Sequence, residues 1–502
     1  MDNVEKNLSE LRNHIRKMNY IIQTEGLINW DMQTGVPEKA IPGRVEVIGY
    51  LYGQLLNMLT DRKVCQWLEY FSDKMDKLSF LDKRMIENLK EEYDQIVKIP
   101  KERSTEYQML CSSSEAFWKK AKENNDYEGF KPYLSKIIEF NREFSEYIGY
   151  EGNIYNKCLN DYEKNISVEK LDGIFKILKD GVVELLEKVK KSNVTIDDSF
   201  LKKKCSISDQ DRFGREVLEK LGYDFQAGRL DTTVHPFTTS FGNKDVRITT
   251  HYYENDFKSA FFSNIHEGGH GIYEQNCDDK LEYTGLSGGT SMGIHESQSR
   301  FYENILGRSK EFWTYFYEDV QATFPQFNEV SFNSFYKAIN KVEPSLIRIE
   351  ADELTYSIHI IIRYEIERAL MNNEITVDEL PDVWNKKCKE YLGVEPSNYS
   401  EGVLQDSHWS GGLIGYFPSY ALGNLYGAQF LNQMKKDIPN YDVEVKNGNF
   451  MIINNWLKEN IHKYGKLYTP SELVVKVTGE ELNPKYFLDY LNKKYSEIYN
   501  IN

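Results

Sequence analysis

The chain has 502 residues, of which 40% are hydrophobic, which is enough for one large domain or for two or three of average size. Its net charge of −16 argues against nucleic acid as a partner, because a basic face is needed to neutralise phosphates. No run of about 18 apolar residues occurs, which argues against a membrane span. The six cysteines include no C-x-x-C pair, and the N-terminal sequence has no apolar signal core, so we expect reduced thiols and a cytoplasmic protein.

The first part of the chain predicts a set of long helices. Apolar residues recur every three or four positions from Val4 to Ile22, as in a helix with one buried face. The turn-rich segment Asn29–Pro37 should end this helix. From there to about residue 220 the sequence is charged, periodic and poor in proline, which favours several long helices packed on one another.

The composition then changes. The segments Thr232–Phe241 and Asp245–Tyr253 are rich in Thr, Val, Ile and aromatic residues, and Gly242-Asn243-Lys244 separates them, so we predict a β-hairpin. A strand at this position could present an edge along a cleft and hold an extended peptide by main-chain hydrogen bonds. The next helix should begin near Asn255 or Asp256, because either residue can cap it.

This helix contains the motif H-E-x-x-H at residues 266–270. Positions i and i+4 of a helix share a face, so His266 and His270 can present two imidazoles to one metal ion. Glu267 is offset by one position, which places its carboxylate beside the metal as a general base. Two ordinary helix histidines are the alternative interpretation.

Two histidines do not complete a catalytic zinc site, which usually has three protein ligands and a water. A second predicted helix follows the glycine-rich turn at Gly288-Gly289 and has His295 and Glu296 near its start. Packed against the first helix, it could bring Glu296 to the metal and complete the ligand set of thermolysin-like zinc peptidases. We favour Glu296 as the third ligand. The alternatives are His295 and a pair of ordinary surface groups.

A further helix is predicted from about Pro344 to Asn372. Arg348, Asp352, Tyr356 and His359 would lie on one of its faces among apolar residues. An ordinary surface ion pair between Arg348 and Asp352 would also explain part of this pattern.

The remaining sequence contains a loop and further helices. Gly402–Tyr420 mixes glycine with polar and aromatic residues and is a plausible cleft wall, and apolar spacing from Leu488 to Ile498 predicts a final packing helix. No internal repeat or linker stands out. We therefore expect a single domain over residues 1–502, helical to about residue 225, with the hairpin, metal site and groove at about 226–425 and C-terminal helices at about 426–502.

Several segments together resemble the carboxypeptidase Taq family of zinc carboxypeptidases. They are Asn29-Trp30-Asp31 with Thr34 and Pro37, His235-Pro236-Phe237, Asp245–Thr249, residues 266–270, Tyr273-Glu274-Gln275, His295–Ser299, Ile347–Asp352 and Gly402–Trp409. The resemblance implies a mainly α fold, namely a large helical single domain with a deep central groove and a small β-sheet near the metal helix, similar to neurolysin and angiotensin-converting enzyme. It also implies a homodimer that removes C-terminal residues from peptides with broad specificity.

The resemblance implies the metal site as well. His266, His270 and Glu296 would hold one Zn²⁺ per chain, or Co²⁺, which the same ligands can bind. Glu267 would be the general base. An endo-acting zinc oligopeptidase and a non-catalytic helical metal-binding protein are the alternatives, because a metal motif alone does not set where a peptide is cut.

Five further residues receive roles from the resemblance. Arg348 would bind the substrate's terminal carboxylate, and a guanidinium suits this task because it can hold a carboxylate at two points. His408 and Tyr420 would donate to the oxyanion. His235 and Arg247 would line the substrate groove.

Overall fold

The structure is a computed structural model that describes residues 3–501, and it confirms the mainly α fold with one small sheet. The helices before the sheet are α1 (Asn3–Thr34), α2 (Ile41–Leu59), α3 (Arg62–Ser72), α4 (Phe80–Lys98), α5 (Lys101–Asn124), α6 (Tyr127–Ile148), α7 (Asn156–Asn160), α8 (Val168–Lys190) and α9 (Ile207–Leu221). None of the helices in residues 3–501 combines the length and apolarity that a membrane span requires.

The sheet and the helices that follow it make up the rest of the chain. The strands are β1 (Gly228–Thr232), β2 (Thr238–Ser240) and β3 (Val246–Thr250). The later helices are α10 (Phe257–Gln275), α11 (Met292–Arg300), α12 (Lys310–Thr323), α13 (Phe332–Ile339), α14 (Glu353–Met371), α15 (Leu380–Tyr391), α16 (Pro418–Asp437), α17 (Tyr441–Lys446), α18 (Met451–Asn460), α19 (Pro470–Thr478) and α20 (Lys485–Tyr499).

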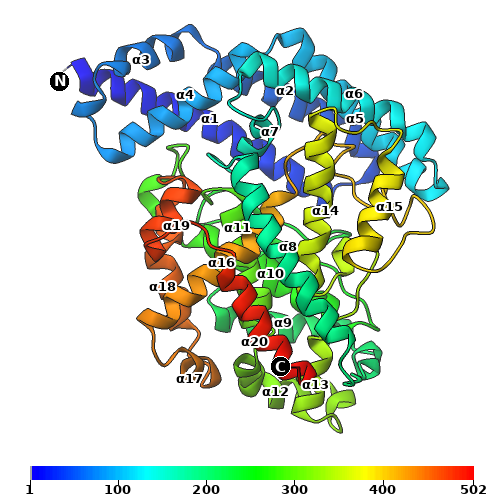
Figure 1. Cartoon of the computed structure of the whole chain (residues 1–502). Coiled ribbons are helices and arrows are strands. Elements are labelled where there is room, and N and C mark those ends of the chain that lie inside the picture. The colour runs from blue at the N-terminus through cyan, green and yellow to red at the C-terminus, as the bar shows by residue number, and fades with distance from the viewer. Residues whose placement is uncertain (1–2, 502) are drawn as a thin grey trace.

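Two hydrophobic clusters organise these helices. The N-terminal helices, blue to cyan in Figure 1, lie across one end of the molecule, and α1, α3 and α4 form a small core of their own. Leu59 of α2 belongs to it too, and among the buried apolar residues described only Leu281, Leu286 and Leu467 join it from beyond α4. The larger core includes the buried faces of α8, α10, α14 and α16. The two metal-motif helices, α10 and α11, therefore lie in the middle of the larger body, beneath the N-terminal layer (Figure 1).

The first helix is longer than we predicted. α1 continues through Asn29 to Thr34, so the prediction that it ends before Asn29 is wrong. Nothing in residues 29–34 prevents helical pairing, and the breakers are Gly35 and Pro37, which lie just beyond the observed end.

The sheet has the strand order β1-β3-β2. β2 and β3 are antiparallel, with Thr238 opposite Ile248, and Gly242 has a positive φ of 118° in the turn between them, so the predicted hairpin is confirmed. Its first strand is shorter than expected, because residues 233–237 are not in the sheet. β1 pairs in parallel with β3 and was not predicted. β2 is thus an edge strand.

The predicted helix from Pro344 to Asn372 is a second correction. α14 begins only at Glu353, because the Asp352 side chain caps it by accepting hydrogen bonds from the Leu354 and Thr355 amides, both at 3.0 Å. Arg348 lies in a separate 3₁₀ turn, Arg348–Glu350. The predicted helical face with Arg348 and Asp352 therefore does not form.

Candidate active site

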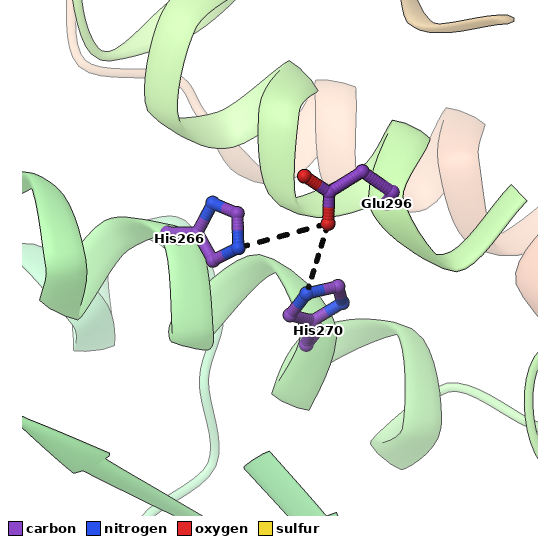
Figure 2. Close-up of side chains that lie close together, drawn as sticks. All are labelled: His266, His270 and Glu296. Carbon is purple, nitrogen blue, oxygen red and sulfur yellow. Dashed lines mark ion pairs between the residues drawn. The ribbon is translucent and has the colours of Figure 1, made fainter. Parts of the chain in front are cut away.

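Helices α10 and α11 bring His266, His270 and Glu296 together (Figure 2). Glu296 Oε2 lies 3.8 Å from His266 Nε2 and 3.6 Å from His270 Nε2, too far for hydrogen bonds. Donor atoms bound to one tetrahedral zinc ion at about 2.1 Å would lie about 3.4 Å from one another. The spacing and the chemistry of these three side chains therefore fit a zinc-type site.

The two helices approach closely because glycine lies at the contact. A Cβ atom on Gly269 would lie 2.8 Å from the Cα of Ser299 in α11. On the other side of α11, a Cβ atom on Gly423 of α16 would lie 2.5 Å from Cγ of Glu296. Since real Cβ atoms do not tolerate such contacts, these glycines permit the position of Glu296 opposite the imidazoles.

The Glu296 carboxylate is held as an anion. Arg300 Nε donates to Oε1 at 2.7 Å, and Ser299 Oγ donates to Oε2 at 3.2 Å. Burial alone would raise the pKa of Glu296, but Arg300 and the two imidazoles hold it well below its usual range. Oε2, the Glu296 oxygen that faces the histidines, therefore carries negative charge and is suited to bind a metal ion.

His270 is oriented by a relay of two further side chains. His295 Nε2 lies 2.8 Å from Glu274 Oε1, and His270 Nδ1 lies 2.6 Å from His295 Nδ1. Burial raises the pKa of Glu274, but the His295 contact outweighs it and brings the pKa to about 2, so Glu274 accepts and His295 Nε2–H donates. His295 Nδ1 then accepts from His270, whose Nε2 keeps its lone pair. His295 thus contacts the back of His270, and the geometry favours Glu296 over His295 as the third ligand.

His266 is oriented by a carboxylate. Its Nδ1 lies 2.8 Å from Glu303 Oε2, which also accepts from Arg300 Nη1 at 3.2 Å. Glu303 lies in the π-helical segment Phe301–Leu306 that continues α11. The extra residue of a π turn aims this carboxylate at the histidine from the same element that carries Glu296.

Glu267 is buried beside the histidines and is held by the sheet. Its Oε2 accepts a hydrogen bond from Thr238 Oγ1 at 2.6 Å, and the same hydroxyl lies 3.1 Å from its main-chain oxygen. Burial raises the pKa of Glu267. Edge strand β2 therefore positions a carboxyl group whose proton affinity is higher than that of an exposed glutamate.

These groups open into a cavity of about 870 Å³, whose wall includes the three candidate ligands, Glu267, and Thr238 and Ser240 of β2. Arg348, Tyr356, Tyr416 and Tyr420 line the same cavity. An adjoining cavity of about 820 Å³ shares His295, Met292 and Lys466 with the first and extends between α2, α4 and α5. The predicted groove is thus present and is roofed partly by the N-terminal helices.

Arg348 is buried but keeps donors free. Its Nε donates to Asp406 Oδ1 at 2.9 Å, Nη2 lies 2.9 Å from the same oxygen, and Nη1 donates to the Tyr356 hydroxyl at 3.1 Å. A guanidinium has five N–H bonds, so one on each terminal nitrogen remains for a further partner. Two N–H bonds on neighbouring nitrogens suit the two oxygens of a carboxylate.

His408 and Tyr420 are in contact, but only Tyr420 belongs to the cavity wall among the described residues. His408 Nε2 lies 3.1 Å from the Tyr420 hydroxyl. Burial lowers the pKa of His408 to about 4, with Arg348 and Arg363 acting in the same direction, so this histidine is neutral near pH 7. It therefore lies behind the tyrosine.

His235 and Arg247 are not brought into this group. The Arg247 guanidinium is bound by both oxygens of Asp245, each at 2.8 Å, and packs over Trp30 at 4.7 Å. His235 is exposed in the segment between β1 and β2. Neither lines the cavity among the described residues, although Pro236 does, so a groove role for them stays a prediction.

Sequence reasoning missed the supporting residues. Arg300 follows Glu296 by one helical turn, and Glu274 belongs to the Tyr273-Glu274-Gln275 segment, so both had a local signal that we did not use. Thr238 and Glu303 had none, because their contacts depend on how separate elements pack.

The site therefore combines a two-histidine, one-glutamate cluster, a neighbouring buried glutamate and an arginine in one groove. Residues 10–495 match the carboxypeptidase Taq (M32) metallopeptidase family. The chain belongs to this family. The resemblance found in the sequence is confirmed, and the chain is a metallocarboxypeptidase, a hydrolase that acts on peptides.

Individual relatives of the M32 family match almost the whole chain. Carboxypeptidase 1 of Bacillus subtilis is 45% identical over 486 residues, which are 97% of each chain. Thermostable carboxypeptidase 1 of Thermus thermophilus is 37% identical, over 96% of this chain and 97% of its own. The crystal structure of the M32 carboxypeptidase from Deinococcus radiodurans superimposes with a TM-score of 0.96 at 34% identity, over 99% of this chain and all of that one.

Proposed function

We propose that this M32 protein is a zinc-dependent metallocarboxypeptidase that removes C-terminal residues from peptides with broad specificity. His266, His270 and Glu296 would hold the zinc ion, and the spacing of their donor atoms supports this. When bound, zinc supplies Lewis-acid chemistry that polarises a carbonyl and makes water acidic near neutral pH. Co²⁺ suits the same ligands. We also propose that residues 1–502 act as one catalytic domain.

Glu267 would be the general base. Its carboxylate would take a proton from the water that attacks the scissile carbonyl and would later give that proton to the leaving amine. Two features support this role, namely its position directly after His266 in α10 and its Thr238 hydrogen bond, which fixes the carboxyl group. Burial raises its pKa, which suits a group that must gain and lose a proton in one cycle.

Arg348 would select the chain end. Two of its N–H bonds have no partner in residues 3–501, and it lines the same cavity as the candidate metal ligands, so it can bind a terminal carboxylate while the last peptide bond lies near the metal. This shared cavity is the observation that carries the proposal. An endopeptidase would need no such cation at the end of its groove.

Tyr420 would donate its hydroxyl to the developing oxyanion, with His408 supporting it from behind. The hydroxyl lies 3.1 Å from His408 Nε2, and that histidine is uncharged near neutral pH. We also propose that the enzyme is a cytoplasmic homodimer. The location is supported by six free thiols, and sedimentation would test the dimer.

The deciding experiment follows the products of one model peptide by mass spectrometry. The free-acid peptide should lose residues one after another from its C-terminal end, and a chelator should stop this loss. The same peptide with a C-terminal amide should be a poor substrate, and Arg348→Ala should abolish the difference. Internal cleavage of both peptides at equal rates would favour the endopeptidase alternative.

A further inference from the structure

The predicted carboxylate-binding arginine belongs to a buried cluster that extends beyond the groove. Arg348 and Arg363 share one carboxylate, that of Asp406. Arg363 Nε donates to Asp406 Oδ2 at 2.7 Å, and Arg348 Nε donates to Oδ1 at 2.9 Å. Arg363 lies on α14, is fully buried and does not line the groove, whereas Arg348 does.

Among residues 3–501, no second carboxylate hydrogen-bonds to either arginine side chain, so the cluster has one positive charge in excess. Burial alone would raise the pKa of Asp406, but Arg363 and Arg348 hold it well below its usual range, so it carries one negative charge against two positive ones. The neighbouring histidines do not add charge near neutral pH, because burial lowers the pKa of His359 to about 3 and that of His408 to about 4. The protein thus buries two cations around a single anion.

A further buried acid, Glu367, lies one helical turn from Arg363 on α14 and is engaged elsewhere. Glu367 accepts hydrogen bonds from Trp409 Nε1 at 2.7 Å, from the Gly415 amide at 2.9 Å and from the Tyr155 hydroxyl. Burial raises its pKa to about 7, so near neutral pH it is only partly ionised. It hydrogen-bonds to neither arginine of the cluster, so it does not replace the missing counterion directly.

An unbalanced buried charge is costly, so its presence calls for a functional explanation. We infer that Arg363 is a positioning residue that reserves one positive charge for the substrate's terminal carboxylate. It does so by binding one oxygen of Asp406 and offsetting its charge, so that Arg348 meets the substrate as part of a cluster with a net charge of +1. Without Arg363, the Arg348–Asp406 pair would be neutral and would attract the substrate's terminal carboxylate much more weakly. This inference rests on the proposed carboxypeptidase function and on Arg348 as the contact residue.

The charge count gives a test that a merely structural role cannot mimic. Arg363→Met should raise KM for a free-acid peptide about 10- to 100-fold, with kcat changed less than about threefold, because the attraction for the terminal carboxylate weakens equally in the ground state and the transition state. Arg363→Met combined with Asp406→Asn restores a net charge of +1 through Arg348 alone. This double variant should recover at least about tenfold in KM relative to Arg363→Met. If Arg363 served only to hold Asp406 in place, the double variant would be no better than the single one, and that result would overturn the inference.

A second variant covers the case in which Arg363→Met does not fold. Arg363→Lys loses the paired N–H geometry but keeps the positive charge. Because the inference depends on the charge, the KM of this variant should stay within about threefold of wild type. A rise as large as that expected for methionine would contradict the charge argument. Lys494→Met is the matched control, because it removes another buried cation, paired with Glu353 at 2.6 Å, away from the groove. It should lower the melting temperature and leave KM unchanged.

The comparison of free-acid and amidated peptides separates the two proposals. If the wild-type enzyme does not prefer the free acid, the proposed exopeptidase function fails before the variants are considered. If wild type prefers the free acid but the double variant does not recover, only the role of Arg363 fails. Equilibrium binding of N-acetylphenylalanine and of its amide, measured without turnover, gives the same comparison independently of kcat.

Discussion

Removing His295 should weaken metal binding without removing a ligand. His295 is the hydrogen-bond partner of His270 Nδ1 among residues 3–501, and the contact is short, at 2.6 Å. In His295→Ala the His270 ring would lose the bond that fixes its tautomer and orientation, and Glu274 would lose its imidazole partner. Loss of such a supporting contact typically costs 10- to 100-fold in metal affinity, which corresponds to about 1.4 to 2.7 kcal/mol.

The assay is a competition titration of the apoprotein against a chelator of known zinc affinity. Glu274→Gln is the matched variant, because it removes the charge at the far end of the relay but leaves both imidazoles. Its effect should be smaller than that of His295→Ala. Glu296→Gln is the reference for loss of a proposed ligand and should weaken zinc binding much more than either.

Two results would refute this reasoning. Zinc affinity equal to wild type in His295→Ala would show that the relay does not support His270. Near-complete loss of zinc in His295→Ala, together with retention in Glu296→Gln, would make His295 the third ligand and would reverse the assignment that the distances favour.

Three further predictions concern other carboxyl groups of the protein. Glu267→Gln should retain zinc by metal analysis but lose about 10²- to 10⁴-fold in kcat, the range that a general base contributes, and an active variant would argue against that role. Thr238→Val removes a hydrogen bond that lowers the pKa of Glu267. The acidic limb of the plot of kcat/KM against pH should therefore move to higher pH. An unchanged acidic limb would mean that another group titrates there. Burial raises the pKa of Glu163 from 4.5 to about 7, so the folded state holds this proton more tightly than the unfolded state. The contribution of Glu163 to the free energy of unfolding should therefore be greatest below pH 4.5 and should be lost as the pH rises to about 7. In Glu163→Gln, denaturant unfolding between pH 5 and pH 8 should lack this decrease.

The metal cluster could be predicted from the sequence because its geometry is local. The spacing of His266 and His270 is fixed by one helix, and Glu296 follows a glycine-rich turn at the start of the next long helix. The cap of α10, predicted at Asn255 or Asp256, is Asp256, and capping depends on residues only three positions apart. Short-range rules therefore predicted the histidine pair, whereas the position of Glu296 also depends on the packing of α11 against α10.

The rest of the groove depends on contacts between distant segments. The Arg348 prediction failed at the level of secondary structure because the apolar periodicity of α14 was extended across Asp352, which instead caps the helix. Arg363 and Asp406 are each unremarkable in the sequence, and only the packing of α14 against the 402–417 loop makes them neighbours. β1 likewise pairs in parallel with β3, and no pattern in the two segments predicts this pairing or its register.

The unpaired edge of β2 also limits what this enzyme can accept. Thr238 and Ser240 of this strand line a groove that the N-terminal helices partly cover. A strand that belongs to a folded sheet brings its neighbours with it and is too wide for such a space, whereas a single extended tail can enter alone. We therefore expect the groove to admit unstructured chain ends and to exclude the folded sheets of native proteins.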